Sequence, residues 1–83
     1  MKLFELISKI PQPDIVVYVY DNDVNLLIRD TIFKLHINLK KLQNKRIKIS
    51  HPIDYLLKYS NVKYIQTYVN YLDITLEDKI KEY

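Results

Sequence analysis

The sequence Ile15-Val16-Val17-Tyr18-Val19-Tyr20 is the most strongly strand-forming stretch of the chain. Its side chains are all β-branched or aromatic, and such side chains favour strands. Because apolar side chains occupy both alternating faces, the stretch predicts a strand that is covered on both sides. The sequence Asp21-Asn22-Asp23 follows it and predicts a turn, since short polar side chains bond readily to nearby backbone.

The residues before this strand predict a helix over residues 2–10. The apolar residues there recur at the spacing of one helical face, at Leu3, Leu6, Ile7 and Ile10. Pro11 and Pro13 follow and end the helix, because proline removes a backbone donor and clashes with the preceding turn.

After the turn, residues 24–29 predict a second strand, and the pattern leaves open whether residues 24–40 form one strand or two. Residues 33–40 alternate without exception. The apolar positions are Phe33, Leu35, Ile37 and Leu39, and the polar positions are Lys34, His36, Asn38 and Lys40. A helix with Ile32, Leu35, Leu39 and Leu42 on one face competes with this strand. That helix leaves Phe33 and Ile37 outside its apolar face, so the alternation favours the strand.

Positive charge is concentrated in the same region. Residues 31–53 hold six Lys or Arg and no Asp or Glu, although the net charge of the whole chain is only +3. Residues 46–50 alternate again, which completes a basic hairpin with residues 33–40. A cationic hairpin can follow a phosphate backbone, although lysine on an open strand face also keeps a sheet soluble. The predicted nucleic-acid-binding residues are Lys34, His36, Asn38, Lys40, Lys41, Lys45, Arg46 and Lys48.

The last third of the chain predicts helices. Pro52 and Asp54 suit the first turn of a helix that runs to about Tyr59. Residues 62–72 have helical spacing but also high β propensity, so helix and strand both remain open there, with helix preferred. Thr75 then predicts the start of a last helix.

Tyrosine is unusually frequent, with eight residues in 83. Tyrosine combines a large apolar ring with a polar tip and therefore suits interfaces and base stacking. Bulky apolar residues are abundant while glycine is absent. A homodimer is therefore expected to bury the apolar surface that does not fit into one small core. The predicted partner-interface residues are Tyr55, Tyr59, Tyr64, Tyr68 and Tyr71.

The sequence holds no motif that predicts catalysis or a cofactor. Without glycine, a phosphate-binding loop or a nucleophile elbow has no residue for its sharp turns. Asp21, Asp23 and Asn25 resemble the opening of a calcium loop, but Leu26 stands where glycine is required. His36 is expected to face solvent and His51 to lie at a helix entry, so no metal site is predicted.

We therefore expect a single α+β domain over residues 1–83. Its expected elements are an N-terminal helix, a small antiparallel sheet of three or four strands with the basic hairpin, and two or three C-terminal helices. The expected function is DNA or RNA binding without catalysis, in the cytoplasm and away from membranes. A protein-binding module, such as an inhibitor of a host enzyme or defence complex, or a minor structural or assembly component of a virion is the alternative. The composition, rich in Ile, Lys, Asn and Tyr, is similar to that of small viral, phage or plasmid proteins.

Overall fold

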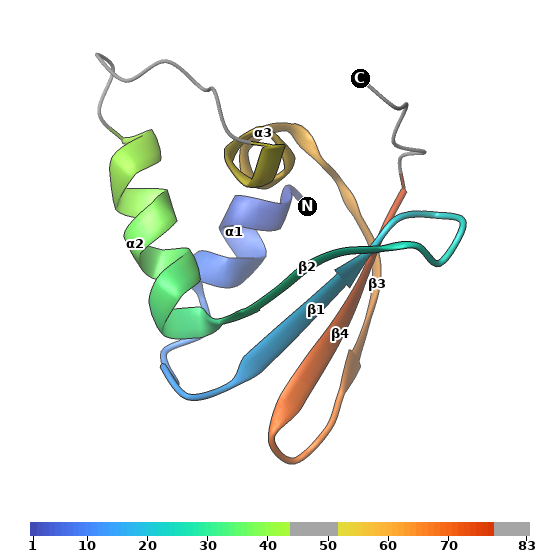
Figure 1. Cartoon of the computed structure of the whole chain (residues 1–83), viewed down its shortest axis with the longest axis horizontal. Helices are drawn as coiled ribbons and strands as arrows, with labels where there is room; N and C mark the ends of the chain where they lie inside the picture. Colours follow the sequence, from blue (N-terminus) through green and yellow to red (C-terminus); the bar gives the residue numbers. More distant parts are fainter. Residues whose placement is uncertain (44–51, 78–83) are drawn as a thin grey trace.

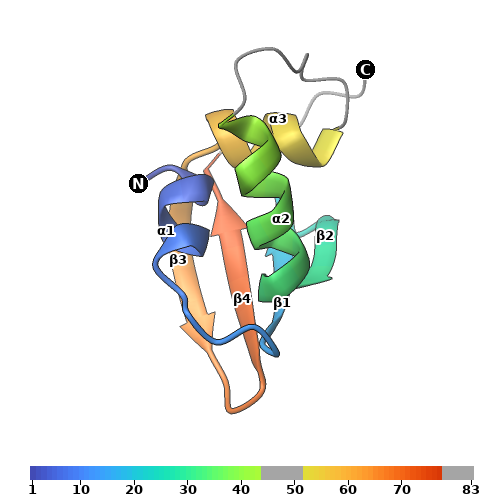
Figure 2. The ribbon, with the colours of Figure 1, turned by 90° about the vertical axis from the view of Figure 1, so that its left-hand side faces the viewer.

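The computed structural model describes residues 1–43 and 52–77, and this part of the chain folds into a mixed sheet of four strands with three helices. The helices all lie on one side of the sheet (Figures 1 and 2). In chain order the elements are α1 (Leu3–Ser8), β1 (Val16–Tyr20), β2 (Leu26–Thr31), α2 (Ile32–Leu42), α3 (Pro52–Tyr59), β3 (Val62–Thr67) and β4 (Tyr71–Leu76). The α+β class is therefore confirmed.

The sheet has the strand order β2-β1-β4-β3. The pairs β1–β2 and β3–β4 are antiparallel hairpins, and β1 and β4 join them in parallel at the centre. The expectation of an antiparallel sheet was thus wrong at this central pair. Sequence periodicity could not reveal this pair, because it joins strands more than fifty residues apart.

The core lies between the helices and the inner face of the sheet. Val17 and Val19 of β1 and Ile74 of β4 are fully buried there. The core cluster also includes Leu3 and Ile7 from α1, Leu35 from α2 and Leu57 from α3. The prediction that β1 is covered on both sides was wrong, because within residues 1–43 and 52–77 all helices lie on one side of the sheet and no element covers its other face.

The N-terminal helix is confirmed as α1. The chain just before it lies beside the entry to β3, where the Leu3 N–H donates to the Ser60 carbonyl at 2.9 Å and Lys2 pairs with Asn61. The predicted helix that begins at Pro52 is likewise confirmed as α3.

Residues 33–40 form part of α2, so the predicted strand there, and with it the first half of the basic hairpin, was wrong. Ile32 and Leu35 are fully buried, and Leu39 and Leu42 pack against the same core. This is the apolar face of the competing helical interpretation. Phe33 and Ile37 remain 59% and 41% exposed. The helix therefore forms although these two apolar side chains lie outside its buried face, which was the reason for preferring a strand.

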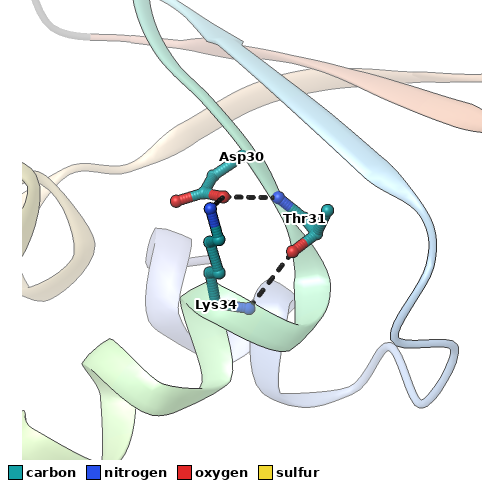
Figure 3. Close-up of polar contacts among 3 residues, drawn as sticks. All are labelled: Asp30, Thr31 and Lys34. Carbon is teal, nitrogen blue, oxygen red and sulfur yellow. Dashed lines mark hydrogen bonds and ion pairs between the residues drawn. The ribbon is translucent and has the colours of Figure 1, made fainter.

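A cap at the junction of β2 and α2 explains why the chain turns into a helix there (Figure 3). The Thr31 hydroxyl accepts a hydrogen bond from the Lys34 N–H at 3.3 Å, which satisfies a free donor of the first helical turn. The Asp30 carboxylate accepts from the Thr31 N–H at 2.8 Å, and its Oδ1 lies 4.0 Å from Lys34 Nζ. Together these contacts end the strand and begin the helix.

Residues 62–72 form the β3–β4 hairpin, so the preferred helix was wrong and the β propensity decided the structure. The Tyr68 N–H donates to the Tyr71 carbonyl at 3.0 Å and closes the turn. Thr75 and Leu76 belong to β4, and therefore no helix begins at Thr75. Residues 78–83, the rest of that predicted helix, lie outside the described residues, as do residues 44–51.

The predicted turn after β1 is confirmed, and Asp21 organises it. One carboxylate oxygen accepts the N–H groups of Asp23 and Asn25, both at 2.9 Å, and the other accepts the Asn25 amide at 3.0 Å. The bond from the Asn25 side chain is the main reason that the pKa of Asp21 lies below its usual value. Val24 adopts a φ of 66° in this turn, which strains a β-branched residue.

Candidate functional site

The predicted nucleic-acid-binding residues do not form one surface in the described part of the chain. Lys34, Asn38 and Lys41 follow one side of α2, at positions i, i+4 and i+7, whereas His36 and Lys40 lie on another. The ring of His36 is half-buried, with Nε2 2.9 Å from the Ile7 carbonyl of α1. His36 thus joins two helices and does not face solvent as expected. Lys45, Arg46 and Lys48 lie outside the described residues.

The predicted tyrosine interface is divided between the two layers of the fold. Tyr55 and Tyr59 lie on α3, with ring centroids 4.9 Å apart, and are 45% and 47% exposed. Tyr64 and Tyr71 lie on β3 and β4, and Tyr68 lies in the turn between these strands. Only this second group borders the open face of the sheet.

The open face of the sheet carries a cluster of aromatic side chains. On β1 and β4, every second residue points to the core, so the residues between them point away from the helices. The strand register brings these outward residues beside Tyr64 of β3 and Arg29 of β2. We call this surface the tyrosine face, and it comprises Tyr18, Tyr20, Arg29, Tyr64, Gln66, Tyr68, Tyr71 and Asp73.

Three tyrosine rings of this face are in contact. The rings of Tyr68 and Tyr71 are stacked, with centroids 4.3 Å apart and planes inclined by 9°. The ring of Tyr18 meets Tyr71 edge to face at 5.7 Å. Tyr68 also donates from its hydroxyl to Gln66 Oε1 at 3.2 Å, which fixes the outer ring. The three rings therefore form a preorganised apolar surface across β1, β4 and the β3–β4 turn.

A cation borders this aromatic surface. The guanidinium carbon of Arg29 lies 5.9 Å from the centre of the Tyr18 ring, within the range of a cation–π contact. Arg29 is exposed and forms no ion pair with another described residue. Its charge is therefore available to an anionic ligand that reaches the rings.

Asp73 contributes the acidic group of the tyrosine face. It lies opposite Tyr18 of β1 and Gln66 of β3, and its side chain is half-buried. Its Oδ1 atom is shielded from solvent and has no hydrogen-bond partner among the described residues. The pKa of Tyr71 is raised, first because burial disfavours the phenolate and then because of nearby groups that include Tyr68 and Asp73.

Five members of the tyrosine face were missed by sequence reasoning, namely Tyr18, Tyr20, Arg29, Gln66 and Asp73. The signal was present in the alternation of Tyr18 and Tyr20 with Val17 and Val19. It was interpreted as a strand covered on both sides, because tyrosine counts as apolar in such a pattern. Which face is open depends on where the helices pack.

The described residues show no group of three or more His, Cys, Asp or Glu side chains placed to hold a metal ion. Nor does this part of the chain contain a helix that is both long and apolar enough to cross a bilayer. Comparison with protein-family models, curated proteins and solved structures finds no match.

Proposed function

We propose that this protein binds single-stranded nucleic acid on the tyrosine face. The observation that carries the proposal is the contact series of Arg29, Tyr18, Tyr71 and Tyr68 across the open side of the sheet. Aromatic side chains on an open sheet stack on unpaired bases, and every base has a π-face to offer. Arg29 is placed to contact a phosphate, and the net charge of +3 favours an anionic partner.

Single strands suit this surface better than a duplex does. The rings stand on a sheet whose strands β1 and β4 are flanked on both sides, so no isolated ribbon is present there to enter a major groove. Stacking requires bases that have left the helical stack, as in single-stranded segments and loops. The basic hairpin first expected as the binding element is replaced by this sheet face in the proposal.

The test is the affinity for a labelled eight-nucleotide single strand, measured by fluorescence anisotropy at low salt. Tyr68→Ala should weaken binding about 5- to 150-fold, because stacking contributes about 1–3 kcal/mol per base. Tyr55→Ala is the matched control, since both residues are 45% exposed but Tyr55 lies on α3, away from the tyrosine face. Equal affinity of the wild type for a duplex and a single strand, or equal effects of the two variants, would contradict the proposal.

A homodimer is a second proposal, favoured by the exposed pair Phe33 and Ile37 on α2. These side chains lie one helical turn apart and are 59% and 41% exposed. A second copy of the chain would cover them. Sedimentation velocity should show a mass that rises with concentration for the wild type and stays monomeric for Phe33→Asp. A monomeric wild type at high concentration would contradict this proposal.

A further inference from the structure

The three contacting rings of the tyrosine face differ in how much of each ring a ligand can reach. Tyr71 is stacked against Tyr68, with centroids 4.3 Å apart, and meets Tyr18 edge to face at 5.7 Å. Strand β4 lies between β1 and β3 in the sheet, so these two contacts reach Tyr71 from opposite sides. Tyr71 is therefore enclosed by its neighbours and supports the stack without offering an open ring face.

Tyr18 is enclosed in a similar way. Its ring contacts Tyr71 on the side of β4, and the guanidinium carbon of Arg29 on β2 lies 5.9 Å from its centre. The residue as a whole is half-buried. A base that stacked on the Tyr18 ring would have to displace Arg29, and the cation–π contact would then be lost.

Tyr68 is the outermost ring of the series and has one open side. Its ring contact among the described residues is the stack with Tyr71, and the residue is 45% exposed. Its hydroxyl donates to Gln66 Oε1 at 3.2 Å, and this bond and the stack together orient the ring. A side chain that is already held in place loses little conformational freedom when a ligand binds. Tyr68 therefore offers one open and preorganised stacking face.

Tyr64 provides a comparison on the same surface, because its ring is exposed but not held by a partner. The residue lies on β3 and is 54% exposed. Within residues 1–43 and 52–77, its side chain makes no hydrogen bond and no ring contact. A base that stacked on Tyr64 would have to fix this ring as well, which costs conformational entropy.

We propose that the tyrosine face binds one base at a time on the open side of Tyr68, and that this position prefers a purine. The inference rests on the proposed function and names the class of base that the same site selects. On platforms of this kind, base preference comes from stacking strength and not from hydrogen bonds. A purine has two fused rings and contacts more of the phenol ring than a pyrimidine does, so it extends the Tyr71–Tyr68 stack more favourably.

Charge and base selection are separated along the face. Arg29 lies at the Tyr18 end of the contact series, and Tyr68 lies at the other end. A phosphate contact from Arg29 adds affinity that does not depend on the base. Arg29→Gln should therefore weaken the binding of every single strand by the same factor and leave the purine preference unchanged.

The experiment compares a labelled uridine octamer with the same octamer carrying one central adenosine, by fluorescence anisotropy at low salt. The wild type should bind the adenosine-containing octamer about three- to fivefold more tightly, the lower part of the range for one stacked base. Tyr68→Ala should reduce this ratio to about one. Tyr64→Ala removes a ring from the same face and should keep the wild-type ratio.

A second adenosine in the octamer tests whether one base binds at a time. It should raise the affinity by no more than about twofold, because the two adenosines compete for one stacking position. Two independent positions would instead multiply the gain from the first adenosine. Tyr68→Phe keeps the ring but loses the bond to Gln66, so it should bind more weakly and still prefer the adenosine-containing octamer.

The possible failures are distinct. No binding of either octamer would overturn the proposed function and this inference together. Equal affinity of the wild type for the two octamers would overturn the inference alone and leave the proposed function intact. A purine preference that persists in folded Tyr68→Ala, its loss in folded Tyr68→Phe or Tyr64→Ala, or a multiplied gain from the second adenosine would each contradict stacking of a single base on Tyr68.

Discussion

Asp21 holds the β1–β2 turn through three hydrogen bonds to the residues that follow it. The same turn contains Val24 at a φ of 66°. A valine is strained in this region of backbone space. The hydrogen bonds of Asp21 therefore stabilise a turn whose backbone conformation at Val24 is unfavourable for valine.

The pH dependence of stability should report these bonds. The pKa of Asp21 is lowered in the folded protein, so its contribution is complete above the unfolded-state pKa and is lost as the pH falls through the folded-state value. Urea unfolding between about pH 5 and pH 2 should therefore show a loss of stability that is smaller in Asp21→Asn. Asp14→Asn is the control and should follow the wild type. Identical pH profiles of wild type and Asp21→Asn would contradict the assignment.

Among the elements, α2 depends on its first turn. Thr31 caps the helix, and Asp30 holds the Thr31 backbone. Thr31→Ala should lower the free energy of unfolding by about 1 kcal/mol, because the Lys34 N–H loses its acceptor. Thr31→Ser keeps the hydroxyl and should retain most of the stability. A thermal or urea midpoint that is equally low in both variants would show that the methyl group, and not the cap, matters.

Only part of the fold could be predicted from the sequence, and α2 shows why. The N-terminal helix, β1, the turn at Asp21 and the helix at Pro52 each have a local cause in apolar spacing, β propensity or proline, and these predictions were correct. Residues 33–40 fit a strand by alternation, and residues 32–42 fit a helix by the spacing of Ile32, Leu35, Leu39 and Leu42. Burial of Leu35 in the core cluster that it shares with residues of α1 and α3 decides between them, and that cluster includes residues distant in sequence.

The candidate site was harder to predict for the same reason. Tyr64, Tyr68 and Tyr71 were selected as surface residues, but on a helix and together with Tyr55 and Tyr59. Tyr18 joins them only because β1 pairs with β4, and Asp73 gains its position from that same pairing. No local pattern contains this information.

At the scale of the whole molecule, the salt dependence of binding separates the tyrosine face from a basic segment. If Arg29 is the cation that contacts phosphate on this face, log K should fall with log salt with a slope of about −0.7. Contacts from all six basic residues between 31 and 53 would instead give a slope of about −4 on a single strand. The measurement is anisotropy titration from about 20 to 200 mM salt. A slope near −4 would indicate that nucleic acid binds the basic residues between 31 and 53 and would contradict binding on the tyrosine face.

The parallel pairing of β1 with β4 has a consequence for how the chain folds. Val16 pairs with Tyr71, about 55 positions further along, so the centre of the sheet closes a long loop of the chain. Such contacts carry a high loop-closure entropy and slow the folding reaction. During synthesis, Val17 and Val19 stay without their β4 neighbours until residue 76 has left the ribosome. Until then the edge of β1 is open to pairing with other chains, and the nascent protein is most prone to aggregation.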